Sequence, residues 1–289
     1  MNAKLAPPID IPANTQANWH AELQLTFTAR PGSTSEGRTV LSHRKHIGPL
    51  LVQRPFWPEG PVCHVYVIHP PGGIAGGDHL QLHAQLDTGA HAMITTPAAT
   101  KFYRAAPGRI SVLKQHLQLQ AATLEWLPQE TIYFNQAQAR VSTRIDLDAA
   151  SRFIGWELNC YGRQAGNEPF VAGQIRQGLE LWLSGKPLLL DHLHVAGDAS
   201  MQRAAWGLQS KCALGTLLAY PATSGDVEAV RELQLDNTQL SVTLVDGVLV
   251  CRCLCDEGAE LKQHLLRVWQ CLRPRIVGRE AVLPRIWAT

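Results

Sequence analysis

Alternation of apolar and polar residues with a period of two runs through most of this chain, from about residue 19 to about residue 255. In the segment 79–86, HLQLHAQL, every second residue is leucine or alanine, so the apolar side chains share one face of a strand. The segment 62–68, VCHVYVI, is rich in β-branched and aromatic residues and follows a proline. The pattern predicts a mainly β fold.

Three segments repeat one arrangement. QLDTGAHAMITTP, LQLQAATLEWLP and IDLDAASRFIGWEL each consist of a strand, a tight turn of small residues and a second strand. Their turn alanines, Ala90, Ala122 and Ala150, are about 30 residues apart. Since one β-hairpin cannot bury its apolar face alone, successive units are expected to stack. Unless the similarity of these turns is coincidental, the fold is an elongated, β-helix-like array of stacked β-hairpins.

One helix is predicted late in the chain, over about residues 257–273, and is expected to pack on the β array. Asp256 is positioned as its N-cap, with glutamates in the first turn. Leucines, Val268 and Trp269 recur at helical spacing and form one apolar stripe. Pro274 is expected to end the helix.

A hairpin and the domain organisation complete the predicted architecture. The segment 241–255 contains two β-rich runs around Asp246 and Gly247, a pair that accepts a type I′ turn. No linker rich in proline, glycine or serine divides residues 19–289, which predicts one β domain that includes the helix. Residues 1–18 have no periodicity and are expected to form a flexible N-terminal tail.

Composition argues against several classes of protein. The 26 Lys and Arg residues against 24 Asp and Glu residues give a net charge of +2, so no surface for nucleic acid or acidic membranes is expected. No apolar stretch of about 18 residues is present to span a bilayer. The N-terminus also lacks the apolar run of a signal peptide. Seven cysteines without a CxxC pair favour a reduced, cytoplasmic protein.

The glycine-rich segment 69–83, HPPGGIAGGDHLQLH, raises the question of a phosphate-binding loop. Its glycine spacing matches neither GxGxxG nor GxxxxGK[ST]. The residues after Asp78 alternate with period two, so a strand follows and no helix N-terminus is available for an anion. The segment is therefore predicted to be a turn between strands. GxSxG and HExxH motifs are also missing from the sequence, so we find no recognisable set of catalytic residues in it.

Five histidines fall between residues 64 and 91, namely His64, His69, His79, His83 and His91. His79 and His83 are four residues apart on a predicted strand and share a face. Imidazole is a good ligand for nickel, zinc or copper. The leucines between these histidines face the opposite way, which is also typical of an ordinary solvent-facing strand surface. Both interpretations stay open.

Cys251, Cys253 and Cys255 fall on one face of a predicted strand. Thiolates at this spacing can hold a soft metal ion, but buried free cysteines also pack as small hydrophobic residues. Packing is the favoured interpretation.

The segment 95–104, TTPAATKFYR, concentrates Lys101, Tyr103 and Arg104 after a proline turn. These side chains can bind an anion or a carboxylate. They are equally consistent with an edge strand whose charges prevent pairing with another chain.

Five motifs in fixed order carry a family resemblance: HPPGGIAGGD, TTPAATKFYR, LPQETIYFNQA, GRQAGNEPF and VWQCLRP…LPRIWAT. From about Trp19 to the last residue, the chain resembles the urease accessory protein D family (UreD, called UreH in some bacteria). The resemblance implies a β-helix-like stack of strands with few helices. It also implies a role without catalysis in the machinery that loads nickel into urease.

The same resemblance implies partners and a cargo. Accessory protein F and the GTPase accessory protein G form a complex with the D protein, which docks the complex onto apo-urease, and accessory protein E supplies the metal. GTP hydrolysis then belongs to a partner. Nickel passes transiently through the interior of the D protein, and no tightly bound cofactor is expected.

The motifs also mark positions in this chain. By resemblance, the marked residues are Pro70, Gly72, Gly73, Gly76, Gly77, Asp78, Thr96, Pro97, Lys101, Tyr103, Arg104, Pro128, Glu130, Arg163, Glu168, Arg273, Pro274, Pro284, Arg285 and Trp287. The chain departs from the pattern before Glu168, where the family usually has glycine and this sequence has Asn167. Asparagine tolerates positive φ better than most residues, so the turn is expected to survive.

A conduit must bind its metal weakly enough to release it, so isolated carboxylates and imidazoles suit it better than a closed four-ligand site. We therefore expect Asp78 and Glu168, with His69, His79 and His83, to line a transient nickel route. Two alternatives remain: a metal-dependent hydrolase that uses the histidines of residues 64–91, and a β interaction module without metal.

Overall fold

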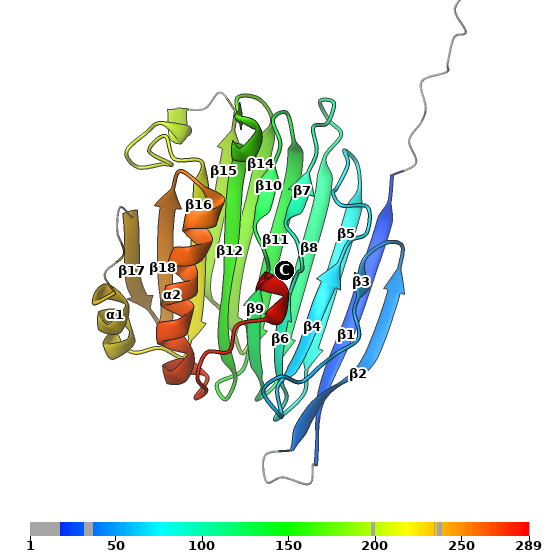
Figure 1. The fold of residues 1–289 in the computed structure, drawn as a ribbon, viewed down its shortest axis with the longest axis vertical. Coiled ribbons are helices and arrows are strands. Elements are labelled where there is room, and N and C mark those ends of the chain that lie inside the picture. Colours follow the sequence, from blue (N-terminus) through cyan, green and yellow to red (C-terminus); the bar gives the residue numbers. More distant parts are fainter. Residues whose placement is uncertain (1–17, 32–36, 198–199, 234, 236–238, 289) are drawn as a thin grey trace, which may run out of the picture.

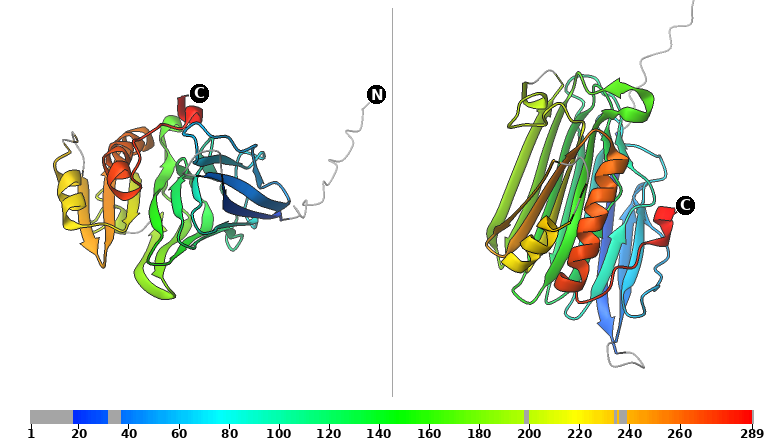
Figure 2. Two further views of the ribbon diagram at one scale, coloured as in Figure 1. Left: turned by 90° about the horizontal axis from the view of Figure 1, so that it is seen from below. Right: turned by 60° about the vertical axis from the view of Figure 1, so that its left-hand side comes forward.

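Two β-sheets lie face to face, and the long helix α2 (Gly258–Ile276) lies on the outer side of one of them (Figures 1 and 2). The computed structural model describes residues 18–31, 37–197, 200–233, 235 and 239–288. A short helix, α1 (Ser224–Arg231), packs against α2. Among the described residues, no helix is long and apolar enough to cross a membrane.

The first sheet has seven strands in the order β15-β14-β11-β8-β5-β1-β2. Its bounds are β1 His20–Arg30, β2 Arg38–Ile47, β5 His79–Leu86, β8 Ser111–Leu119, β11 Gln138–Leu147, β14 Gln174–Leu183 and β15 Lys186–Ala196. The five central strands pair in parallel, and β2 and β15 close the two edges in antiparallel pairs.

The second sheet follows the order β17-β18-β16-β12-β9-β6-β4-β3, with β7, β10 and β13 attached beside this path. Its bounds are β3 Leu51–Val52, β4 Cys63–Ile68, β6 His91–Thr95, β7 Thr100–Phe102, β9 Thr123–Leu127, β10 Thr131–Tyr133, β12 Arg152–Arg163, β13 Glu168–Pro169, β16 Ala213–Tyr220, β17 Gln239–Val245 and β18 Val248–Cys255. Strands β4, β6, β9 and β12 pair in parallel, and β16, β18 and β17 extend the sheet in antiparallel pairs.

The chain winds between the sheets as a β-helix. At the turns that contain Ala90, Ala122 and Ala150 it passes from β5 to β6, from β8 to β9 and from β11 to β12. Backbone hydrogen bonds stack these turns, because the N–H groups of Thr123 and Arg152 donate to the carbonyls of Ala90 and Ala122, both at 2.8 Å. The predicted β-helix-like stack is confirmed. Within a unit, however, the two strands pair with neighbouring units instead of forming a hairpin with each other, because the turn redirects the chain into the opposite sheet.

Alternation along the strands produces two apolar layers. The inward residues of the first sheet, such as Leu25 and Phe27, pack against the second sheet. The other face of the second sheet packs against α2, with Trp156, Leu265 and Trp269 among the buried residues. Strand β12 is consequently buried on both faces, which explains why its sequence does not alternate cleanly.

The predicted hairpin is present as β17 and β18. Asp246 (φ 47°) and Gly247 (φ 78°) both adopt the positive φ values that a type I′ turn requires. The predicted N-terminal tail, residues 1–18, lies outside the described residues except for Asn18.

The two ends of helix α2 differ from the prediction. The N-cap is Glu257, one residue later than expected, and the Asp256 carboxylate pairs with Lys211 at 2.7 Å instead of capping the helix. Pro274 lies within the last turn instead of ending the helix. The helix continues to Ile276, which is buried, and the N–H group of Val277 still bonds to the backbone of the last turn.

Candidate functional site

Two of the sequence motifs meet at a cavity of about 310 Å³ that opens between the sheets. The 69–78 loop connects β4 of the second sheet to β5 of the first sheet, so it is the predicted turn between strands. Ile74 of this loop bonds through its N–H to the carbonyl of Lys101 at 2.7 Å. We call this space the motif cavity, and its lining includes His69, Pro70, Gly72, Gly73, Thr96, Pro97, Lys101 and Gln115.

Gly73 is required for the two motif segments to approach each other. A Cβ atom at this position would lie 2.4 Å from the ring of Tyr103. The Tyr103 ring in turn packs edge-on against Phe134, with 5.3 Å between centroids. Strand β7 has β10 as its strand partner, and on its other side Ile74 of the loop bonds to the backbone of Lys101 and Tyr103, so this edge is covered by the loop.

His69 and Asp78 have different environments in the same loop. The Asp78 carboxylate is buried and accepts backbone N–H bonds from Trp19 at 3.0 Å and Ala75 at 2.9 Å, so it closes the loop. His69 lines the motif cavity, and its buried Nε2 atom has no hydrogen-bond partner. Burial lowers the pKa of His69 despite the opposing charge of Asp78, which favours a neutral imidazole with a free lone pair.

Polar side chains also occupy one level of the interior between the sheets. We call them the interior polar row: Gln115, Thr143 and Asp191 from the first sheet, and Glu157, Thr216 and Arg252 from the second. Gln115 and Thr143 are neighbours in register, as are Glu157, Thr216 and Arg252. Asp191 and Arg252 form an ion pair at 2.7 Å that joins β15, the edge strand of the first sheet, to β18 of the second. Arg252 is exposed, so this end of the row lies at the surface. Because Gln115 also lines the motif cavity, the row begins there.

Glu157 is the acidic residue at the centre of this row. The Thr143 hydroxyl lies 2.5 Å from the Glu157 carboxylate and 2.8 Å from Gln115 Oε1. A hydroxyl has one proton and cannot donate to both acceptors, so both contacts are satisfied when a protonated Glu157 donates to Thr143 and Thr143 donates to Gln115. Burial raises the pKa of Glu157 to about 7, which is consistent with this arrangement. Glu157 can therefore exchange a proton near neutral pH.

A second charged group lies under helix α2, and we call it the buried ion cluster: Arg273, Glu125, Glu59, His64 and His91. The Arg273 guanidinium donates to Glu125 at 2.8 and 2.9 Å and lies 2.7 Å from Glu59. Burial on its own raises the pKa of Glu125, but hydrogen bonds and charges from His91 and Arg273 outweigh burial and hold it at about 2. The motif residue Arg273 thus joins α2 to the second sheet.

The C-terminal motif folds back onto the same sheet. Trp287 donates from Nε1 to the Thr95 hydroxyl at 3.1 Å, and its ring lies 5.7 Å from that of Trp156. The indole of Trp156 donates to the Pro128 carbonyl at 2.8 Å. The Thr96 hydroxyl accepts from the Gln129 N–H at 2.9 Å. The second, third and fifth motifs therefore meet in one structural unit.

The remaining predicted metal residues are not brought together. His79 and His83 lie on the outer face of the first sheet, because their neighbours Leu80 and Leu82 occupy the inner face. His83 contacts Gln118 at 2.7 Å there. These two histidines therefore do not face the space between the sheets, and their part in a nickel route stays a prediction. The five histidines of residues 64–91 are distributed among the outer face, the motif cavity and the buried ion cluster, so they do not form one catalytic centre.

Glu168 lies at the surface, where it pairs with Arg163 at 3.2 Å. Asn167 before it adopts a left-handed conformation (φ 49°), so the turn survives the departure from the family pattern as expected. Glu168 does not belong to the interior polar row. Glu157, which does, was not among the predicted residues, because its position depends on contacts between strands far apart in the sequence.

Cys251, Cys253 and Cys255 are buried in the apolar layer under α2, as the packing interpretation predicted. Burial raises the pKa of Cys251 to about 12, so this thiol is inert near neutral pH.

The parallel β-helix, the motif cavity and the interior polar row define a β-solenoid protein with a row of polar side chains in an otherwise apolar interior. The family model described as UreD urease accessory protein matches residues 20–288, and the chain belongs to this family. Its members are accessory proteins, which agrees with the prediction that the chain is not an enzyme.

Relatives named urease accessory protein UreD align with almost the whole chain. The Enterobacter sp. (strain 638) protein is 44% identical over 276 residues, which cover 94% of this chain and 96% of the relative. The Klebsiella aerogenes protein is 42% identical, over 94% of this chain and 97% of the relative. The Pseudomonas entomophila protein is 42% identical, over 96% and 97%. The chain therefore has a role in urease maturation.

Proposed function

We propose that this chain conducts Ni²⁺ through the space between its two sheets during urease maturation. In this proposal it docks on apo-urease in the cytoplasm, together with accessory protein F and the GTPase accessory protein G, and accessory protein E supplies the nickel. The metal is cargo and not a resident cofactor. GTP is hydrolysed by the partner, consistent with the strand that follows the glycine-rich loop.

The observation that carries this proposal is the interior polar row. Burying polar groups in an apolar core costs free energy, so we expect a row of buried polar side chains only where these side chains have a function. Carboxylate, amide and hydroxyl oxygens bind Ni²⁺ more weakly than a thiolate-rich site would, which suits transfer.

Glu157 is suited to a transfer step. At neutral pH its carboxyl group is close to half-protonated, because its pKa is about 7. An arriving cation can displace the proton, and the proton can return when the cation leaves. Charge is then buried only while the metal is present.

The two ends of the row suggest where nickel enters and leaves. At one end, the neutral His69 imidazole offers an unpartnered nitrogen to the motif cavity. At the other end, the Asp191 carboxylate is held by Arg252 and is partly exposed. Cation passage there requires the ion pair to open.

Co-expression with urease subunits tests the proposed role. Urease made with accessory proteins E, F and G plus this chain is expected to be active and to contain nickel, whereas omission of this chain is expected to leave inactive apo-urease. Equal activity in the two preparations would contradict the proposal. Affinity capture of the chain with F, G and apo-urease tests docking separately.

A further inference from the structure

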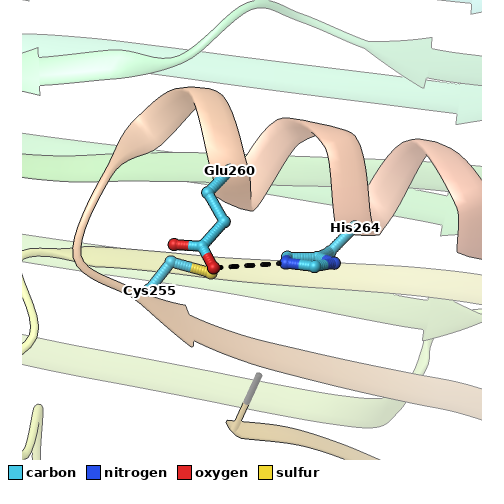
Figure 3. A group of neighbouring side chains, drawn as sticks. All are labelled: Cys255, Glu260 and His264. Atoms are coloured by element: carbon cyan, nitrogen blue, oxygen red, sulfur yellow. Dashed lines mark ion pairs between the residues drawn. The ribbon is translucent and has the colours of Figure 1, made fainter. Parts of the chain in front are cut away.

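A cysteine, a glutamate and a histidine meet where β18 ends and α2 begins (Figure 3). The Cys255 Sγ atom, a Glu260 carboxylate oxygen and a His264 ring nitrogen all lie within 4.8 Å of one another. Glu260 and His264 are four residues apart and project from one face of α2 toward the end of the strand. The three donors come from two elements that the fold holds together.

His264 is a buried side chain without a hydrogen-bond partner. The residue is 9% exposed, and neither Nδ1 nor Nε2 makes a hydrogen bond. Its Nε2 atom is 3.5 Å from the Glu260 carboxylate, which is an ion-pair distance without hydrogen-bond geometry. A buried polar group is normally satisfied by protein, water or a bound ion. A ring nitrogen of His264 without a hydrogen-bond partner therefore lies beside a thiol and a carboxylate.

The donor set selects a class of metal ion. Sulfur, imidazole nitrogen and carboxylate oxygen together suit Zn²⁺ and other divalent ions of borderline softness, including Ni²⁺, and do not suit Mg²⁺ or Ca²⁺. Tetrahedral bonds of about 2.0–2.3 Å place ligand atoms roughly 3.3–3.8 Å apart, so small side-chain rotations would close the site. Cys253 Sγ lies 3.6 Å from Cys255 Sγ, within that range.

We propose that Cys255, Glu260 and His264 bind a divalent metal ion of the zinc and nickel class, with the fourth position left to water or to Cys253. Glu260 is the most exposed of the three and lies at the entrance. The bound ion would link the end of β18 to the first turns of α2.

This site is separate from the proposed nickel route. Cys255 belongs to the apolar layer under α2, whereas the interior polar row lies on the opposite face of the second sheet. Arg252 of the row and Cys255 are three residues apart on β18 and point to opposite faces. A resident ion here would stabilise the chain, and the proposal does not depend on the role in urease maturation.

Metal titration of the purified full-length chain tests the proposal. After removal of metals with a chelator, Zn²⁺ and Ni²⁺ are titrated separately against a chromophoric competitor, and Co²⁺ is used as a spectroscopic probe. We expect a cobalt–thiolate charge-transfer band that is lost in Cys255→Ser. We also expect binding at least about 10-fold weaker in His264→Gln and Glu260→Gln. Preference for zinc or nickel in the two titrations identifies the ion.

Matched controls separate this site from other thiols and histidines. Cys271→Ser removes a partly buried thiol elsewhere on α2, and His83→Ala removes a histidine of the outer face, so both are expected to behave as wild type. Glu157→Gln is also expected to keep the band, which distinguishes this site from the nickel route. A wild-type chain without the band, or a band that persists in Cys255→Ser, overturns the proposal. If Cys255→Ser does not fold, the Glu260→Gln variant tests the proposal instead. An unchanged metal affinity in Glu260→Gln would contradict the proposed site.

Discussion

Replacing Arg273 by methionine removes the guanidinium of the buried ion cluster and leaves two carboxylates in the protein interior. Arg273 is fully buried, as is Glu125, and Glu59 is its second partner. Removing one partner of a buried pair costs about 3–5 kcal/mol, because the remaining charge is uncompensated. The fall in the pKa of Glu125 from 4.5 to about 2 corresponds independently to about 3 kcal/mol. We therefore expect the melting temperature to drop by on the order of 10 °C.

The pH dependence has a defined sign. The folded-state pKa of Glu125 lies below its unfolded value, so this contribution to stability is present above about pH 4.5 and is lost as the pH falls from 4.5 toward 2. The melting temperature of the wild-type chain is expected to fall steeply over that interval. Arg273→Met is expected to lose much of this dependence, because part of the cause of the low pKa is gone.

Thermal melts followed by circular dichroism measure both effects. Arg275→Met is the matched control, since the Arg275 side chain is on the same helix but is 44% exposed. Its buried partner Asp226 keeps its hydrogen bonds to Thr223, so the loss of stability is expected to be smaller. Arg273→Met combined with Glu125→Gln is expected to recover part of the lost stability. The charge argument would be refuted by an Arg273→Met melting temperature within about 2 °C of wild type, or by a double variant less stable than the single one.

Two further predictions concern the interior. Glu157 has a folded-state pKa of about 7, above the unfolded value of 4.5, so its protonated form stabilises the fold and this contribution is lost as the pH rises through 7. Glu157→Gln is therefore expected to melt above wild type at pH 8 and close to it at pH 5, and equal differences at both pH values would exclude the raised pKa. Gly73→Ala places a Cβ atom 2.4 Å from the Tyr103 ring and is expected to cost about 1–3 kcal/mol in denaturant unfolding. Gly225→Ala in α1, where the nearest atom is 3.5 Å away, is expected to be neutral or stabilising, and the steric argument fails if the two variants are equally stable.

The local sequence pattern was sufficient to predict the strands, the long helix and the turn whose glycines resembled a phosphate-binding loop. The alternation in 79–86, the positive-φ pair Asp246 and Gly247, and the apolar stripe of α2 each report on a few neighbouring residues. Strand partners were harder, because alternation identifies a buried face without saying which strand lies beside it. The repeat units were consequently assigned as hairpins, although their strands belong to opposite sheets.

The candidate site shows the same limit. Histidines at 79 and 83 share a face as predicted, but only the tertiary structure shows that it is the outer face. Glu157 and Thr143 lie on strands of different sheets and contact each other across the interior, and no spacing in the sequence predicts that contact. The Cys255, Glu260 and His264 group, by contrast, has a readable signal, because Glu260 and His264 are one helical turn apart just after the cysteine.

The nickel content of urease matured in the presence of interior variants tests the central claim most directly. Urease is co-expressed with accessory proteins E, F and G and with wild-type chain, Glu157→Gln or the outer-face control His83→Ala, and nickel per urease active site is measured on purified enzyme. Capture of F and G by each variant confirms that the complex still forms. The account predicts full nickel loading with wild type and His83→Ala and clearly reduced loading with Glu157→Gln. Full loading with Glu157→Gln and with a Thr143→Val, Glu157→Leu double variant would contradict a route through the interior polar row.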